Sequence, residues 1–305
     1  MKIKQKAFLL GLISALFFAV TFVVNRLMSV EGGSWIWSAS LRFYWMLPFF
    51  LIIVVVRGNL NPLLCAIKQN FGAWILWSSI GFGFFYAPLT YAAAFSPSWL
   101  VASTWQITII AGMILAPFIT KSYQSPSSKN AYLFSGIIIL GIAIMQVNAL
   151  QSVEFSNLLA GLFWVLIAAF AYPLGNRKMM QLANGKLDVY QRILGMILCS
   201  IPFWLVLNLY GYSTGHNNPT ESQLLQTLIV AIFSGVIATV LFFSATDMVR
   251  ENEKELAKVE ATQSAEVVFA VIGEITILHS PLPDTYAWIG IVFVVVGMSL
   301  HSVKK

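Results

Sequence analysis

Long apolar stretches alternate with short polar breaks along all 305 residues of the chain. Each stretch is close to the roughly 20 residues that an α-helix needs to cross the hydrocarbon core of a bilayer. The pattern predicts an all-α integral membrane protein with ten transmembrane helices. Their expected ranges are 7–29, 34–56, 71–93, 98–120, 131–149, 156–173, 188–210, 224–246, 258–278 and 285–302.

Composition agrees with the pattern and excludes a soluble enzyme. Hydrophobic residues make up 58% of the chain and charged residues only 10%, against about 25% charged in ordinary soluble domains. The sequence contains no phosphate-binding loop, Ser/His/Asp set or Cys/His cluster with metal-ligand spacing. We therefore expect no enzymatic activity, no cofactor, no metal and no nucleic-acid partner.

The basic residues orient the predicted helices. With the N-terminus in the cytoplasm, fifteen of the eighteen basic residues fall on the cytoplasmic side, as the positive-inside rule requires. These are Lys2, Lys4, Lys6, Arg57, Lys68, Lys121, Lys129, Arg177, Lys178, Lys186, Arg250, Lys254, Lys258, Lys304 and Lys305. A missed helix would reverse every later segment, so this bias predicts ten spans with both termini cytoplasmic.

The two halves of the chain, residues 1–150 and 151–305, resemble each other. Matching positions occur in the same order about 150 residues apart: Gly11 with Gly161, Asn25-Arg26 with Asn176-Arg177, Arg42 with Arg192, Gln106 with Gln263, and Gly136 with Gly290. Because each half has an odd number of helices, the second half must enter the bilayer in the opposite orientation. Two inverted five-helix repeats are typical of secondary transporters.

The ninth predicted helix contains the run Ala261-Thr-Gln-Ser-Ala-Glu-Val-Val-Phe-Ala-Val-Ile-Gly-Glu274, with Glu266 before an apolar stretch. With ten helices in two halves, the chain resembles the drug/metabolite transporter superfamily of EamA-like proteins. Val267 occupies the position where that superfamily usually has proline. This departure and the acid-rich segment before the helix resemble the multidrug resistance efflux transporter branch, which implies export of organic cations or amphipathic compounds.

Polar residues gather on one face of that ninth helix. Glu260, Gln263, Glu266 and Glu274 lie within about 120° of one another on a helical wheel. The helical rise places Glu266 about 12 Å deep, near the bilayer midplane, where a carboxylate usually faces a cavity or a partner. Glu266 is therefore either a proton and substrate-cation site or a permanently paired structural acid.

Arg42 also lies deep, about 12 Å from the outer surface. It stays protonated, so it either holds an anionic group of the substrate or fixes an acid on another helix. Gln106 and Gln263 either bind substrate from opposite sides or join the fourth and ninth helices. Tyr44, Trp45, Tyr86 and Trp105 lie away from the helix ends and are candidates for cation–π contacts, with helix packing as the alternative.

These patterns together predict a multi-pass secondary transporter of the inner or plasma membrane. Its expected function is proton-coupled export of small organic compounds by alternating access, with Asn25, Asn176 and Asp247 as gate or helix-end polar residues. One alternative is uptake or exchange of an amino acid or other small metabolite held by Arg42. Another is a non-transporting membrane scaffold or lipid-handling protein. The expected partners are a small-molecule substrate, protons and the lipid bilayer.

Overall fold

The computed structural model describes residues 3–119, 129–152, 155–216 and 218–303, and the ordered elements in these ranges are all helical. The elements in chain order are α1 (Ile3–Val30), α2 (Trp35–Val56), α3 (Leu60–Gln69), α4 (Phe71–Ser78), π-helix η1 (Ser79–Gly83), α5 (Phe84–Ala92), α6 (Ser98–Trp105), α7 (Ile107–Ile119), α8 (Lys129–Ser152), α9 (Phe155–Ala183), α10 (Val189–Ser213), α11 (Glu221–Val230), π-helix η2 (Ala231–Ala238), α12 (Thr239–Val249), α13 (Glu253–Ala261), 3₁₀-helix η3 (Thr262–Ser264), α14 (Ala265–Thr276) and α15 (Thr285–Val303).

The expected all-helical, strongly apolar architecture is present. Six segments are long and apolar enough to cross a membrane: Ile3–Val30, Trp35–Val56, Ser98–Ile119, Leu159–Ala183, Val189–Ser213 and Glu221–Val249. Leu133–Val147 and Thr285–Leu300 are shorter apolar helices. Each of the ten predicted ranges overlaps observed helix, while their number as membrane spans and their inverted arrangement remain predictions.

Two features of the helices differ from the expected ranges. Helix α9 continues past Pro173 to Ala183, because a proline within a helix removes one hydrogen bond and bends the helix without necessarily ending it. The helix ends where Asn184 and Gly185 adopt positive φ angles of 44° and 68°. Helix α3, in a segment predicted as a loop, buries Leu63 and exposes Lys68.

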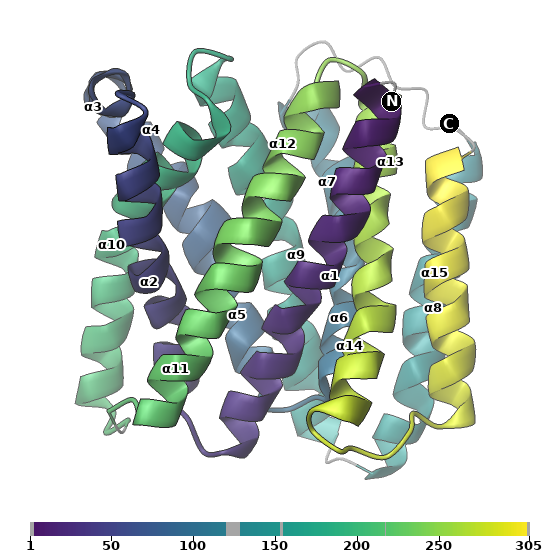
Figure 1. Ribbon diagram of the computed structural model, residues 1–305. Helices are drawn as coiled ribbons and strands as arrows, with labels where there is room; N and C mark the ends of the chain where they lie inside the picture. Colours follow the sequence, from purple (N-terminus) through teal and green to yellow (C-terminus); the bar gives the residue numbers. More distant parts are fainter. Residues whose placement is uncertain (1–2, 120–128, 153–154, 217, 304–305) are drawn as a thin grey trace.

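The helices form a bundle in which the start of α1 and the end of α15 lie at the same end (Figure 1). Helix α1 packs against η2, α12 and α14, and α9 packs against η1, α5 and α7. Helix α2 packs against α10, and α8 lies beside α15 at one edge of the bundle. The helices therefore contact partners from both halves of the sequence.

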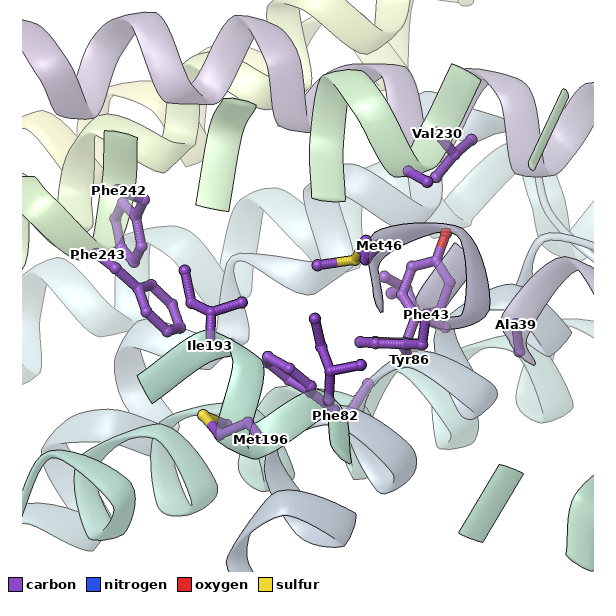
Figure 2. Packing of buried hydrophobic residues seen from close by; sticks show 14 of the residues in the cluster. Ala39, Phe43, Met46, Phe82, Tyr86, Ile193, Met196, Val230, Phe242 and Phe243 are labelled. Atoms are coloured by element: carbon purple, nitrogen blue, oxygen red, sulfur yellow. The ribbon is translucent and has the colours of Figure 1, made fainter. Parts of the chain in front are cut away.

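Aromatic side chains fill much of the interior. Figure 2 shows Phe43, Phe82 and Tyr86 gathered together, contributed by α2, η1 and α5. Phe43 also stacks on Trp204 of α10, with 4.7 Å between ring centroids. Gly81 and Gly175 let η1 and α9 approach very closely, since a Cβ built on Gly175 would lie 2.3 Å from the Gly81 Cα. Such close packing, rather than escape from water, holds helices together within lipid.

Candidate functional site

A cavity lies in the middle of the bundle, between helices of both halves. Nine of its 27 lining residues are aromatic, and several of the rings touch one another. Phe85 lies 5.1 Å from Trp105 and 4.8 Å from Tyr172, measured between ring centroids. The aromatic lining residues are Phe18, Phe22, Phe43, Phe82, Phe85, Trp105, Tyr172, Phe242 and Phe243. This wall suits an apolar or aromatic body and, through ring faces, an organic cation.

Irregular helical segments border the cavity. Phe82 comes from η1, Ser234 from η2 and Gln263 from η3, and all three residues line the space. Single π-helical turns and short 3₁₀ stretches inside longer helices often occur at functional sites, because they redirect side chains and release backbone groups.

Glu266 lies in the first turn of α14 and lines the cavity with only 2% of its surface exposed. Its Oε2 atom is buried and has no hydrogen-bond partner, and among the described residues no basic side chain forms an ion pair with it. A buried acid in a structural role would be expected to have a permanent partner. The placement therefore favours a carboxyl group that exchanges a proton or binds a ligand.

Arg42 lines the same cavity with 4% of its surface exposed. Its Nη1 donates to Thr21 Oγ1 at 3.4 Å and its Nη2 to Ser234 Oγ at 3.0 Å. Its guanidinium carbon lies 4.2 Å from the centre of the Tyr86 ring. Within the described part of the chain Arg42 forms no ion pair. The structure therefore shows no acid that Arg42 would fix, as the structural alternative requires.

Two other charged pairs stand close to this region. Arg177 Nη2 lies 3.2 Å from Glu260 Oε1, and both residues line the cavity. Arg192 Nη1 lies 2.9 Å from Asp247 Oδ1, while its guanidinium carbon is 4.7 Å from the centre of the Phe243 ring. These arginines are neutralised by a carboxylate, unlike Arg42.

Exposure increases along the cavity toward the end of the bundle that holds the start of α1. The side chains of Arg177 and Glu260 are 22% and 27% exposed, far more than Arg42 or Glu266. At the opposite end, the Tyr91 ring contacts Trp35, Phe95 and Trp164, with centroid distances of 4.8, 5.0 and 5.4 Å. Arg177 and Glu260 are thus more exposed than the other two charged residues of the lining, Arg42 and Glu266.

Glu274 is buried but belongs to a different environment. It accepts hydrogen bonds from the backbone N–H and the hydroxyl of Ser98, the first residue of α6, and from Ser280. It satisfies a donor at the start of α6, as a capping acid does. Glu274 thus has fixed hydrogen-bond partners, which indicates a structural role. Glu266 lies on the same helix face, but its Oε2 atom has no such partner.

Five of the predicted site residues line the cavity, and the others are not among its lining residues. The lining residues are Glu266, Gln263, Arg42, Trp105 and Asn176. Gln106 is fully buried and donates to the carbonyls of Ala102 and Gln263, which favours the alternative that it joins the fourth and ninth helices. Gln263 donates to Ser14 and the Gly11 carbonyl of α1.

The remaining predicted residues do not line the cavity themselves and have other partners. Tyr44 accepts from Asn208, and Trp45 donates to Thr227. Tyr86 and Asn25 hydrogen-bond each other, which places Asn25 one layer behind the ring that faces Arg42. Asp247 pairs with Arg192.

The sequence patterns did not identify several residues of the site. Thr21, Ser234 and Tyr172 line the cavity, yet hydroxyl and aromatic residues are common in membrane helices and carry no distinct signal. Glu260 also lines the cavity, and it shares a helix face with Gln263 and Glu266. That shared face was the available signal for its position in the cavity.

Lys4, Glu255 and Lys258 form a charged cluster outside the cavity lining. Partial burial raises the pKa of Glu255, but hydrogen bonds and charge from Lys258 and Lys4 outweigh this effect and hold the pKa below its usual value. The cluster connects the start of α1 to α13.

No group of three or more His, Cys, Asp and Glu side chains in the described ranges is arranged to hold a metal ion.

Comparisons with known proteins agree with this architecture. Residues 5–305 match the family described as "EmrE: Putative multidrug resistance efflux transporter". The chain is 48% identical over 307 residues to "Uncharacterized protein YjlA" of Bacillus subtilis (strain 168), covering 98% of this chain and 94% of that protein. It is 45% identical over 269 residues to an "Uncharacterized 42.1 kDa protein in intracellular alkaline protease 3'region" of Shouchella clausii, covering 86% of this chain and 70% of that protein.

One solved crystal structure has the same fold. It superposes with a TM-score of 0.67 and covers 97% of this chain and 96% of its own, at 12% sequence identity. The family match over nearly the whole chain agrees with the predicted drug/metabolite transporter resemblance. Together with the long apolar helices, it establishes that the chain belongs to the EmrE-like transporter family described above and is a multi-pass protein of the cell membrane.

Proposed function

We propose that this protein exports small cationic or amphipathic organic compounds by alternating access, driven by protons that enter through Glu266. The observation that carries the proposal is the position of Glu266: it is buried, it lines an aromatic cavity, and no basic side chain of the described residues pairs with it. Membership of a transporter family supports the same class of activity.

The coupling follows from charge balance at one carboxyl group. An ionised carboxylate in a low-dielectric cavity is costly, and either a proton or a cationic substrate removes that cost. The two compete for the same group, so binding of a cation releases the proton. If the cavity then opens alternately to the two sides, proton entry drives substrate exit.

An inverted repeat would supply the two alternating states, and the helix packing supports one. Helix α1 packs on η2, α12 and α14, and its counterpart α9 packs on η1, α5 and α7. The third and eighth predicted spans each contain a π-helix, η1 and η2. The fourth and ninth spans each lose regular α-helix at or beside the matched glutamines, Gln106 and Gln263. Such pairing is expected of two halves that exchange conformations.

The partial exposure of Arg177 and Glu260 supports a state that is open toward the cytoplasm, given the predicted orientation. The rings around Tyr91 pack together toward the opposite, outer side of the predicted topology. In the opposite state, we expect the Arg177 end to close and the Tyr91 contacts to separate. Asn176, which lines the cavity one residue before Arg177, would move with this end.

The direct test is proton release from purified protein in weakly buffered detergent. Adding a quaternary ammonium dye should release protons from the wild type, whereas Glu266→Gln should release none because it lacks the titrating carboxyl group. Glu221→Gln is the matched control, since it removes an exposed acid in the first turn of α11. Proton release that persists unchanged in Glu266→Gln would contradict the coupling.

A second candidate function is uptake or exchange of an amino acid or another small metabolite. Arg42 favours it, because this buried guanidinium forms no ion pair within the described residues. The two candidates differ in net flux, so accumulation of labelled substrate in vesicles of known orientation separates them.

A further inference from the structure

We infer that the cavity is built for a zwitterion, with Arg42 holding an anionic group of the substrate while Glu266 holds its cationic group. The inference rests on the proposed transport function and specifies the substrate class. It starts from the charged side chains that line the cavity: Arg42, Arg177, Glu260 and Glu266.

Only two of these four charged side chains form an ion pair with each other. Arg177 and Glu260 neutralise each other at 3.2 Å. Arg42 and Glu266 remain, each more than nine-tenths buried and each without an ion-pair partner in the part of the chain that the structure describes. A substrate that is only a cation neutralises Glu266 but leaves the positive charge of Arg42 uncompensated. A zwitterion neutralises both groups at once.

The surroundings of Arg42 are those of an anion site. Its Nη1 and Nη2 are fixed by Thr21 and Ser234, while its Nε–H is buried and has no acceptor. Ser234 accepts hydrogen bonds from both Arg42 and Thr21. Its own hydroxyl proton therefore stays available for a carboxylate or phosphate oxygen. Guanidinium and hydroxyl donors side by side are suited to such oxygens.

The two charged groups line one cavity, so a ligand in that cavity can contact both. By the helical rise, Arg42 is about 12 Å from one surface and Glu266 about 12 Å from the other, in a core about 30 Å thick, which leaves about 6 Å between them in depth. The rings of Phe43, Phe82 and Phe242 line the same space and would contact its apolar body (Figure 2).

The test is a binding measurement with matched ligands on the purified full-length protein. Each set contains an aromatic zwitterion, its methyl ester with only the amine charged, and its N-acetyl derivative with only the carboxylate charged. Phenylalanine and 4-(aminomethyl)benzoic acid give sets with short and long charge separation. In at least one set, blocking either charge should weaken binding by about tenfold or more.

The variants assign each charge to its partner. Arg42→Gln should bind the zwitterion no more tightly than its ester, because the group that holds the carboxylate is gone. Glu266→Gln should bind the zwitterion no more tightly than its N-acetyl derivative, because the group that holds the amine is gone. Arg192→Gln is the matched control: it is a buried arginine, but it pairs with Asp247 outside the cavity lining, so both preferences should remain. Thermal unfolding of each variant verifies that the protein is folded.

The outcomes separate this inference from the proposed function. Esters that bind as tightly as the zwitterions in every set, or no binding by any member, would overturn the zwitterion site. If quaternary ammonium dyes still release protons in the same preparation, the proposed function stands without it. If neither dyes nor zwitterions release protons, the coupling itself fails.

Discussion

Arg42, Arg177 and Arg192 lie inside the bundle and differ in the groups that surround their guanidinium groups. Arg177 and Arg192 each have a carboxylate partner, whereas Arg42 has hydroxyl groups and an aromatic ring. A buried ion pair adds little net stability, but removal of one partner is costly because a buried charge then remains alone. At the residue scale, paired charges are therefore expected to affect folding, and unpaired charges to affect transport.

The Arg192–Asp247 pair provides a test of this division. Asp247→Ala should lower the free energy of unfolding by up to about 3 kcal/mol, the low end for a buried pair. We expect the low end because the Asp247 side chain keeps 21% exposure, against 5% for Arg192. Unfolding in detergent, followed by circular dichroism, measures the loss. The double variant Arg192→Met/Asp247→Ala should recover much of it; equal losses in both would indicate a role other than charge pairing.

At the element scale, the irregular segments and one of the closest helix contacts lie near the cavity. The π-helix η1 contributes Phe82 to the cavity and Gly81 to the contact with α9. The same short segment thus shapes the site and sets how closely two helices approach. Predicted apolar ranges locate such helices, but the irregular hydrogen bonding within them depends on what packs against them.

The contact between Gly81 and Gly175 should be sensitive to a single methyl group. In Gly175→Ala the new Cβ would lie 2.3 Å from backbone atoms of Gly81, so η1 and α9 must separate. We expect a loss of about 1–3 kcal/mol in the free energy of unfolding. Gly72→Ala is the control, because a Cβ there meets open space. Equal unfolding temperatures for the two variants would show that the helices do not need this close approach.

At the scale of the whole molecule, the chain ends and the connecting loops divide between two ends of the bundle. The start of α1 and the end of α15 lie at one end (Figure 1). The segments around Gln69 and Lys186 belong to the predicted cytoplasmic side, and those around Glu31 and Leu282 to the outer side. This division depends on every helix crossing the bilayer.

Cysteine labelling in intact cells tests the division. Single cysteines at the exposed positions Glu31 and Leu282 should react with a membrane-impermeant maleimide, whereas those at Gln69 and Lys186 should react only after the cells are opened. The native Cys65 and Cys199 are first replaced to remove background labelling. Labelling of Lys186→Cys in intact cells would contradict the predicted topology.

The sequence by itself determined the helical, membrane-embedded architecture, because apolar length and charge position depend on the bilayer and not on any particular neighbour. It also singled out Glu266 and Arg42, since buried charges are rare in apolar helices. The sequence did not show that Gln263 lines the cavity while Gln106 does not, or that α9 continues beyond Pro173. Both outcomes depend on how the helices pack. Only the tertiary structure decided which charges are paired and which face the cavity: Arg177 meets Glu260 across 83 residues of sequence, while Arg42 and Glu266 have no such partner among the described residues.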